Sequence, residues 1–324
     1  MVAAAVVLAC ALLPSSGVAG QHSGAERVAI FYYPWYANPT KDGRWAHWYV
    51  DHDGTPVLST RYFPSRGLYS SSSAKIVSAQ MHEIAAAGVG TIVVSWWGFD
   101  SPENDRLAPV VEAAMQEGLD VAIHIEPYRG RTPGSAADDI EQLHRTYGVT
   151  DFYVYDADSD PAADWAAALA PLDDVRVFGH TPFVGRAKAS GFDGLYTYDV
   201  VTWTGALFRR LCTQAHAAGL LCAPSVGPGY DARLATNMDS VRPRNDGLTY
   251  DRMWKTALRA NPDLVTVTSY NEWQEGTQIE PARVATGKPS YEGAWGMHGV
   301  AAQRSYLAAT AHWAERLRGL PTSR

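Results

Sequence analysis

The sequence is poor in the motifs that mark several common kinds of site. Only three of its 324 residues are cysteines, and no CxxC, HExxH or Cys/His cluster is present. A G-x-S-x-G elbow and a glycine-rich phosphate-binding loop are also missing. These motifs supply zinc ligands, an exposed serine nucleophile and a phosphate cradle. We therefore expect neither a metal ion nor a cofactor in this protein.

Positive charge is also scarce. The chain has 27 Lys and Arg residues against 34 Asp and Glu residues, a formal net charge of −7, and no Lys/Arg-rich run. Binding to a phosphate backbone requires a basic surface, so this balance argues against a nucleic-acid partner. Hydrophobic residues make up 46% of the chain, a fraction that is sufficient for a large core and atypical of disordered chains.

Long hydrophobic runs are confined to the N-terminus. Val2–Leu13 is apolar and Val18–Gly20 resembles a small-residue cleavage site, so we expect residues 1–20 to be a signal peptide, although no Lys or Arg precedes the apolar run. The run is too short to span a bilayer. We expect residues 21–324 to form the mature chain, secreted or held in the cell envelope, without a membrane span and as a monomer.

Two questions about the cysteines stay open in the sequence. Cys10 lies in the apolar run, at a position that only faintly resembles a lipoprotein acylation site. Cys212 and Cys222 remain after cleavage, and an oxidising compartment would allow a disulfide between them. Their spacing fits two buried free thiols nearly as well.

No sequence repeat and no linker divides the chain, but short β-rich runs alternate with alanine-rich segments. Several of the runs are continuously apolar, which is typical of parallel strands that are buried on both faces. The eight expected strands are Val28–Tyr33, Thr91–Ser95, Val121–Ile125, Phe152–Tyr155, Val175–Phe178, Gly194–Tyr198, Leu220–Pro224 and Leu264–Thr268.

Amphipathic segments between these strands predict helices. Ser135 is the candidate N-cap of one helix, and Asp160 is the candidate N-cap of the next, with Pro161 at its first position. Eight strands that alternate with helices predict a single (β/α)8 barrel, an α/β fold, with a doubly wound open sheet as the alternative. The expected helices are Ser73–Ala87, Asn104–Gln116, Ala136–Arg145, Ala162–Ala170, Pro182–Ser190, Trp203–Ala218, Tyr250–Ala260 and Gly299–Arg318.

Polar and charged residues are densest in the stretch from Val265 to Glu280. It begins as a β-branched strand and then presents Glu272 and Glu275, three residues apart, with Trp273 between them. Paired carboxylates divide acid and base roles when their environments separate their pKa values. Aromatic faces suit sugar rings, and the chain has 11 Trp and 17 Tyr residues. We therefore expect a glycan-active enzyme, with a solvated acidic loop as the alternative.

The other expected strands also end in aromatic or polar residues. Active sites of (β/α)8 barrels lie at the C-terminal ends of the strands, so these residues are candidates for a shared cleft. Two of them have a structural alternative. His124 alternates with apolar neighbours and fits a core histidine, and Glu126 is a candidate partner of Arg129 or Arg131.

Several longer motifs lie at these strand ends, namely FYYPWY, DGRWAHW, SWWG, HIEPYRGR, GFDGLYTYD and TSYNEWQEGTQIEPA. Together they resemble glycoside hydrolase family 99, the endo-α-1,2-mannosidases and endo-α-1,2-mannanases, over roughly residues 27–318. The resemblance implies a (β/α)8 barrel and retaining hydrolysis of an internal α-mannosidic bond next to a 1,2-linkage. It also implies that the loop after the second strand, here Trp97–Pro102, sets the choice between glucose-capped and mannose-capped substrates.

In the implied reaction, the substrate's 2-hydroxyl attacks the anomeric carbon, and water then opens the resulting 1,2-anhydro sugar. Glu272 is the implied base for that hydroxyl, and Glu275 is the implied acid and then base. A conventional retaining route instead needs a carboxylate nucleophile about 5 Å from the acid, for which Glu126 is the candidate. The expected substrate-binding residues are Tyr36, Trp96, His124, Glu126, Tyr128, Tyr198, Tyr230, Asn271 and Trp273.

The expected substrate is an α-mannan or a mannose-containing oligosaccharide. Two other functions fit the same residues. One is a retaining endo-glycosidase that acts on another α-glycan, and the other is a carbohydrate-binding barrel without turnover. The presence of both Glu272 and Glu275 in an intact motif argues against the second.

Overall fold

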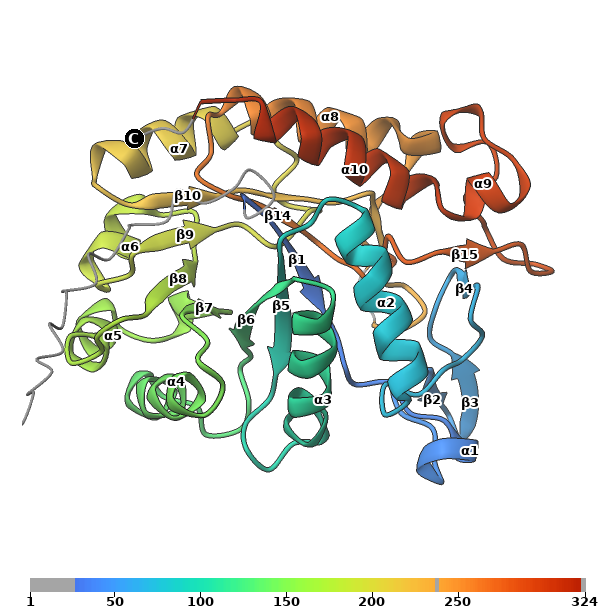
Figure 1. Ribbon diagram of the computed structural model, residues 1–324, viewed down its shortest axis with the longest axis horizontal. Helices are drawn as coiled ribbons and strands as arrows, with labels where there is room; N and C mark the ends of the chain where they lie inside the picture. Colours follow the sequence, from blue (N-terminus) through green and yellow to red (C-terminus); the bar gives the residue numbers. More distant parts are fainter. Residues whose placement is uncertain (1–26, 237–238, 322–324) are drawn as a thin grey trace, which may run out of the picture.

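A nine-stranded parallel sheet forms the centre of the molecule. The computed structural model describes residues 27–236 and 239–321, and Figure 1 shows the sheet with helices packed outside it. The strand order is β10-β9-β8-β7-β6-β5-β1-β14-β11. The strands are β1 (Val28–Tyr32), β5 (Thr91–Trp96), β6 (Asp120–Ile125), β7 (Asp151–Val154), β8 (Arg176–His180), β9 (Gly194–Tyr196), β10 (Leu221–Ala223), β11 (Ser225–Val226) and β14 (Val265–Val267).

The two ends of this sheet meet in one short stretch of chain. β10 pairs with β9, β11 pairs with β14, and only Pro224 separates β10 from β11. Proline has no backbone N–H and interrupts a ladder, but the Pro224 carbonyl still accepts from Thr266 N (3.2 Å). The nine strands therefore fill the eight positions of a (β/α)8 barrel, which confirms the predicted fold.

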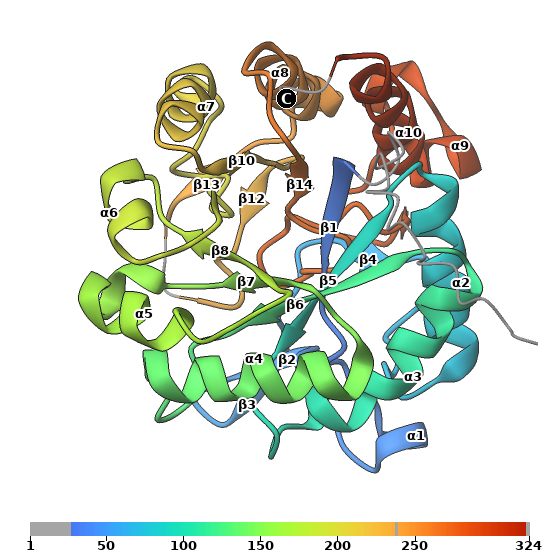
Figure 2. The ribbon, with the colours of Figure 1, turned by 60° about the vertical axis from the view of Figure 1, so that its left-hand side comes forward.

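Helices follow the strands and surround the sheet (Figure 2). α10 packs against both α8 and α2. The last ring helix therefore closes the ring onto α2, the first ring helix. The ring helices are α2 (Ala74–Ala86), α3 (Pro102–Gln116), α4 (Pro133–Tyr147), α5 (Ala162–Leu169), α6 (Val184–Ala189), α7 (Phe208–Ala217), α8 (Leu248–Arg259), α9 (Gly299–Gln303) and α10 (Ser305–Arg318). Every predicted helical segment thus contains a helix.

The N-caps of two helices differ from the prediction. Thr132 rather than Ser135 caps α4, and the two residues form a capping box in which each side-chain oxygen accepts from the other's backbone N–H (2.9 and 3.1 Å). The helix therefore begins at Pro133. At α5 the N-cap is Pro161, not Asp160, and no side chain caps the helix.

Two helices are shorter than predicted. α7 begins at Phe208 instead of Trp203, because Gly205 has a φ of 94° that a right-handed helix does not contain. The final helical segment is broken at Arg304, whose φ of −105° and ψ of 5° end α9 and start α10.

Short elements around the barrel were not predicted. Their strands are two to four residues long, which is too short for an alternating pattern to be recognised. The β4–β15 pair joins the segment after β1 to the residues that follow the acidic stretch. These elements are α1 (Pro39–Asp42), β2 (Tyr49–His52) paired with β3 (Thr55–Leu58), β4 (Phe63–Pro64) paired with β15 (Ala282–Arg283), β12 (Tyr230–Asp231) paired with β13 (Val241–Arg242), and the 3-10 turns η2 (Ala157–Ser159), η3 (Asn245–Gly247) and η4 (Ala294–Gly296).

Aromatic rings fill the inside of the barrel. Tyr153 stacks on Phe178 (4.8 Å between ring centroids) and meets Tyr196 and Phe31 edge-on (5.2 and 5.9 Å). These four side chains are almost completely buried. A Cβ atom on Gly194 would lie 2.6 Å from the Phe178 ring, so the size of this ring explains a glycine inside a strand.

A disulfide joins Cys212 of α7 to Cys222 of β10, with the two Cα atoms 5.2 Å apart. Of the two alternatives that the sequence left open, the structure therefore has the disulfide and not two free thiols. Cys10 and the expected signal peptide lie outside the described residues. Within residues 27–236 and 239–321, none of the helices has the length and apolar character needed to cross a bilayer.

Candidate active site

The C-terminal end of β14 leads into residues 268–280, which carry both predicted catalytic carboxylates. Tyr270 N donates to the carbonyl oxygen of Phe31 (2.9 Å), so the chain stays attached to the end of β1 before it turns. Ser269 Oγ accepts from Glu272 N (2.8 Å). The backbone that presents the first carboxylate is therefore held both by β1 and by Ser269 of its own segment.

The surroundings of the two carboxyl groups favour their protonated forms. Glu272 is 4% exposed, and burial, followed by the charges of Glu275 and Glu126, raises its pKa well above the ordinary value. Burial, followed by the charges of Asp199 and Glu126, raises the pKa of Glu275 to about 8. Because Glu272 and Glu275 repel each other, their titration steps belong to the pair and not to either residue alone. A proton is therefore retained in the site at neutral pH.

Glu126, which follows β6, is held by neighbouring strands. Ser95 Oγ donates to Glu126 Oε1 (2.7 Å), and Trp97 Nε1 donates to Ser95 Oγ (3.1 Å). His124 Nδ1 lies 2.9 Å from the same Glu126 oxygen, in a contact that is close but poorly aligned for a hydrogen bond. The carboxylate is thus fixed in orientation and lies within electrostatic reach of both predicted catalytic groups.

The sequence offered a structural alternative for His124 and another for Glu126, and the structure bears out only the first. His124 is 1% exposed and its Nε2 is hydrogen-bonded to Tyr196 Oη (2.8 Å), which is the buried position expected of a core histidine. The pairing of Glu126 with Arg129 or Arg131 is not observed. Arg131 donates to backbone carbonyl oxygens instead.

Tyrosine hydroxyls surround the carboxylates. The Tyr33 and Tyr198 hydroxyls are hydrogen-bonded to each other, and burial, followed by the charge of Glu272, raises the pKa of Tyr33. Burial and then the charge of Glu275 raise the pKa of Tyr155. These phenols are neutral hydrogen-bonding groups at physiological pH. Tyr33 and Tyr155 were not predicted, although both lie in the aromatic strand ends of the sequence.

Four of the expected substrate-binding residues are fully buried, namely Tyr36, Trp96, Asn271 and Trp273. Tyr36 Oη donates to the carbonyl oxygen of Asn271 (2.8 Å) and accepts from Trp273 N (3.0 Å). Trp96 Nε1 donates to Asn104 Oδ1 (3.0 Å). These side chains have no free surface for a sugar ring in this structure, so they support the wall of the site from behind.

The remaining expected residues lie nearer the mouth of the barrel. Tyr198 and Tyr230 are 5% and 7% exposed, and burial, followed by the charge of Glu275, raises the pKa of Tyr230. Tyr128 is half-buried, but its hydroxyl donates to Asp139 of α4. Tyr198 and Tyr230 therefore share the neighbourhood of the carboxylates, whereas Tyr128 is turned toward a helix.

A cavity of about 410 Å³ lies beside the ends of β1 and β5, lined in part by aromatic rings. Trp35 stacks on His47, with 4.3 Å between the ring centroids, and burial lowers the pKa of His47 to about 4. Trp97, whose indole bonds to the serine that holds Glu126, forms another wall. Trp45 is 44% exposed at the edge. None of these four rings was among the predicted binding residues, although each lies in a quoted motif.

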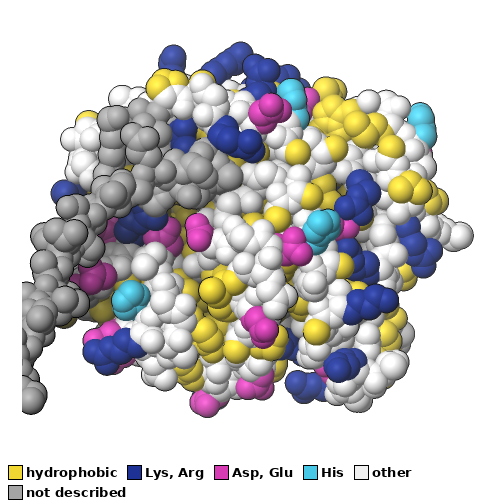
Figure 3. Space-filling model, viewed as in Figure 1, with side chains coloured by type: hydrophobic (Ala, Val, Ile, Leu, Met, Phe, Trp, Pro, Cys, Tyr) yellow, Lys and Arg dark blue, Asp and Glu magenta, His cyan; other side chains and the backbone are white. Residues whose placement is uncertain are grey.

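No group of His, Cys, Asp or Glu side chains in residues 27–236 and 239–321 is arranged to hold a metal ion. A second cavity, about 970 Å³, lies between α8 and α10 on the outside of the barrel. Figure 3 shows Lys and Arg side chains gathered along the upper edge, over these helices. The lining of this outer cavity contains none of the carboxylates or tyrosines described above. The barrel mouth therefore remains the candidate active site.

Comparison with known proteins gives a consistent result. The family described as Glycosyl hydrolase family 99 matches residues 24–319. The chain is 32% identical to a glycoprotein endo-alpha-1,2-mannosidase-like protein of Danio rerio, covering 81% of this chain and 72% of that protein. It is 30% identical to the protein of the same name from Homo sapiens, with coverages of 78% and 68%. The solved GH99 endo-alpha-mannosidase of Bacteroides thetaiotaomicron has a TM-score of 0.82 and 28% identity, covering 90% of this chain and 97% of that one.

Proposed function

Since the chain belongs to glycosyl hydrolase family 99, we propose that it is an endo-acting α-mannosidase that cleaves internal α-mannosidic bonds next to an α-1,2-linked mannose, with retained anomeric configuration. The observation that carries the proposal is the carboxylate pair after β14, Glu272 and Glu275, whose pKa values burial raises. The similar proteins named endo-α-mannosidases support mannose as the sugar.

The first step forms a 1,2-anhydro sugar. The Glu272 carboxylate takes the proton of the substrate's 2-hydroxyl as the O2–C1 bond forms, and Glu275 gives its proton to the leaving oxygen as the C1–O bond breaks. A pKa of about 8 keeps Glu275 protonated at neutral pH, as a general acid requires. The raised pKa of Glu272 makes its ionised form a stronger base. The 2-hydroxyl lies beside the reacting carbon, which gives a high effective molarity.

The second step opens the three-membered ring. Glu275, now a carboxylate, takes a proton from water as the water oxygen bonds to C1, and the O2–C1 bond breaks. Glu272 returns its proton to O2. Each step inverts the configuration at C1, so the two together retain it. The site then holds the same protons as at the start and needs no co-reactant other than water.

The cavity beside β1 and β5 supports a sugar chain rather than a single sugar as the ligand. Aromatic faces bind the C–H surfaces of sugar rings, and Trp35 and Trp97 line the cavity while Glu103 supplies a polar wall. Trp97 connects the cavity to Glu126 through Ser95. A second sugar unit bound there would place its neighbour near the carboxylates, as endo-acting cleavage requires.

Product analysis tests the proposal. Purified residues 21–324 would be incubated with an α-1,2-branched mannan and with a glucosylated high-mannose glycan. We expect a disaccharide to be released from at least one of them, with retained configuration by NMR. A mannose disaccharide would identify a mannanase, and a glucose-capped one a glycoprotein-type mannosidase. A folded sample that releases nothing from either glycan would contradict the proposed substrate.

A second route, with Glu126 as a covalent nucleophile, also deserves a direct comparison because the charge of Glu126 acts on both other carboxylates. The two routes differ in their need for the substrate's 2-hydroxyl. A mannoside that carries a 2-O-methyl group at the cleaved sugar cannot form the anhydro ring. We expect it to bind without being cleaved. Cleavage at an undiminished rate would transfer the nucleophile's role to Glu126.

We also propose that the protein is exported, with residues 1–20 as the signal peptide. The Cys212–Cys222 disulfide supports this proposal, because disulfides persist in oxidising compartments and are rare in the cytosol. The mass of the native protein tests it. Export predicts an N-terminus near residue 21 and a position outside the cytoplasm, whereas an intact, cytoplasmic chain would contradict it. Size-exclusion chromatography with light scattering would test the expected monomer.

A further inference from the structure

Glu280 closes the stretch that carries the two catalytic carboxylates, and it is fully buried. Its Oε1 accepts from Gln80 Nε2 (2.9 Å) and Arg66 Nη1 (3.2 Å). Its Oε2 accepts from Tyr69 Oη (2.8 Å) and Trp273 Nε1 (2.8 Å). Four donors therefore converge on one carboxylate that is buried under the site and takes no part in the proposed chemistry.

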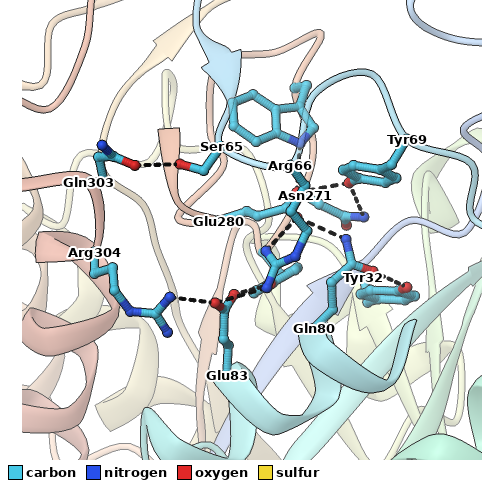
Figure 4. A network of polar contacts seen from close by, with 12 residues as sticks. Tyr32, Ser65, Arg66, Tyr69, Gln80, Glu83, Asn271, Glu280, Gln303 and Arg304 are labelled. Carbon is cyan, nitrogen blue, oxygen red and sulfur yellow. Dashed lines mark hydrogen bonds and ion pairs between the residues drawn. The ribbon is translucent and has the colours of Figure 1, made fainter. Parts of the chain in front are cut away.

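Three of the donors, Arg66, Tyr69 and Gln80, are far from Glu280 in the sequence, and Figure 4 shows these three converging on it. Arg66 and Tyr69 precede α2, and Gln80 lies on α2. Tyr32 Oη, from β1, donates to Gln80 Oε1 (2.7 Å), which turns the amide so that its NH₂ group faces Glu280. The orientation of the Gln80 amide is thus fixed by Tyr32 rather than left to rotate.

The ionised form of Glu280 fits this arrangement. A carboxylate accepts from all four donors, whereas a protonated carboxyl would direct an O–H at a group that already donates. Burial raises the pKa of Glu280, and the charge of Arg66 and the hydrogen bonds oppose that rise. Arg66 also contacts Glu83 (2.8 Å), which Arg304 contacts in turn (2.6 Å), so two guanidinium groups balance two carboxylates.

We propose that Glu280 is a positioning residue for the hydrolysis. Its bond to the buried Trp273 indole fixes the chain between Glu272 and Glu275, and thereby the placement of both carboxyl groups against the substrate. The backbone of the same tryptophan is held separately by Tyr36 Oη (3.0 Å). This inference rests on the proposed function, which identifies the glycosidic bond that is cleaved. The anchoring of the segment itself does not depend on which sugar binds.

Two single variants and their combination test the proposal. Trp273→Phe keeps a buried ring but removes the indole N–H, and Glu280→Gln places an amide NH₂ against a donor. We expect each to lower kcat about 10- to 100-fold, as misplacement of catalytic groups does, with a smaller change in KM. The losses of the two single variants should not add in the double variant, because both changes act on the Trp273–Glu280 bond.

Glu83→Gln is the matched control. It also removes a buried carboxylate from Arg66, but it leaves the Trp273 indole bond in place. We expect it to lower the melting temperature while kcat stays near the wild-type value. An equal loss of kcat in Glu83→Gln would assign the effect to general loosening and overturn the proposal. An unchanged kcat in folded Glu280→Gln would overturn it as well.

Hydrogen exchange of residues 269–280 separates this inference from the proposed function. We expect faster exchange there in Glu280→Gln than in the wild type or Glu83→Gln, in the absence of any substrate. If the wild type cleaves no mannoside but this difference is found, the assigned reaction fails and the anchoring stands. Equal exchange in all three would overturn the anchoring. Should Glu280→Gln not fold, the same comparison with Trp273→Phe decides the question.

Discussion

At the scale of single residues, burial sets the protonation state on which the proposed acid role of Glu275 depends. Burial and the charges of Asp199 and Glu126 raise its pKa to about 8, so its carboxyl group is protonated at the pH where an ordinary glutamate is ionised. The acid role is lost when that proton leaves. We expect kcat/KM to fall as the pH rises through about 8, and to fall on the other side of the optimum as Glu272, whose own pKa burial also raises, becomes protonated. A pH–rate profile with an optimum near 4 would contradict this assignment.

The same shift predicts a pH-dependent stability. A carboxyl group whose pKa is higher in the folded state stabilises the fold below its ordinary value of 4.5, and this contribution is lost as the pH rises toward about 8. Glu275→Gln removes the cost of ionising a buried carboxyl group. Its melting temperature should therefore rise relative to the wild type between pH 5 and pH 8.5. Glu315→Gln changes an exposed carboxylate and serves as the control. Parallel melting curves for Glu275→Gln and the wild type would rule out the shifted pKa.

The sequence predicts these carboxylates better than it predicts their aromatic neighbours. Glu272 and Glu275 are found from their spacing after a strand. Whether Trp273 faces a sugar or the core depends on partners such as Tyr36 and Glu280, which lie in the bonded network of the fold and not in a local pattern. The pattern therefore predicts aromatic residues at the strand ends as a class, but it does not decide which of them faces a sugar and which faces the core.

At the scale of elements, the eight barrel positions were predictable because each is a short β-rich run, several of them continuously apolar, that alternates with a helical segment. The division of the seventh strand at Pro224 was not, because it reflects pairing with two different neighbours. The N-cap of α4 was missed because Thr132 and Ser135 are both capping residues, and only the geometry of the capping box distinguishes them. The paired strands near the mouth are too short to leave a pattern.

Packing between β8 and β9 gives a prediction about glycine. A Cβ atom on Gly194 would lie 2.6 Å from the Phe178 ring and 2.9 Å from Leu221 Cβ. Gly194→Ala should therefore lower the free energy of unfolding by about 1–3 kcal/mol, the usual cost of overpacking. Gly185→Ala is the matched control, because nothing lies within 4 Å of its added Cβ, and it should be neutral or stabilising by up to about 1 kcal/mol. Urea titrations that give equal midpoints for the two variants would refute the packing argument.

The disulfide between α7 and β10 gives a second prediction for the elements. Cys212 and Cys222 are ten residues apart, and cross-links of this kind contribute about 2–4 kcal/mol, chiefly by restricting the unfolded chain. The double variant Cys212→Ala/Cys222→Ala should be destabilised by about that amount. A reductant should destabilise the wild type and leave the double variant unaffected. A wild type that is insensitive to reductant after full unfolding and refolding would show that the bond contributes no stability.

At the scale of the whole molecule, the barrel brings together groups that the sequence separates. Glu126 follows β6 and the Glu272–Glu275 pair follows β14, yet the charge of Glu126 contributes to the raised pKa of both Glu272 and Glu275. Parallel strands place all their carboxyl ends at one face, so polar residues after each strand share one mouth. This is why the strand ends, and not the covering helices with their larger outer cavity, indicate the candidate site.

The rate of α-1,2-branched mannan hydrolysis by Glu275→Gln, relative to the wild type, tests the central claim most directly. We expect a loss of at least about 100-fold, the lower range for removal of a general acid, in a protein that melts no lower than the wild type at pH 7. A Glu275→Gln variant that cleaves the mannan at the wild-type rate would contradict the assignment of this carboxylate as the acid of the reaction.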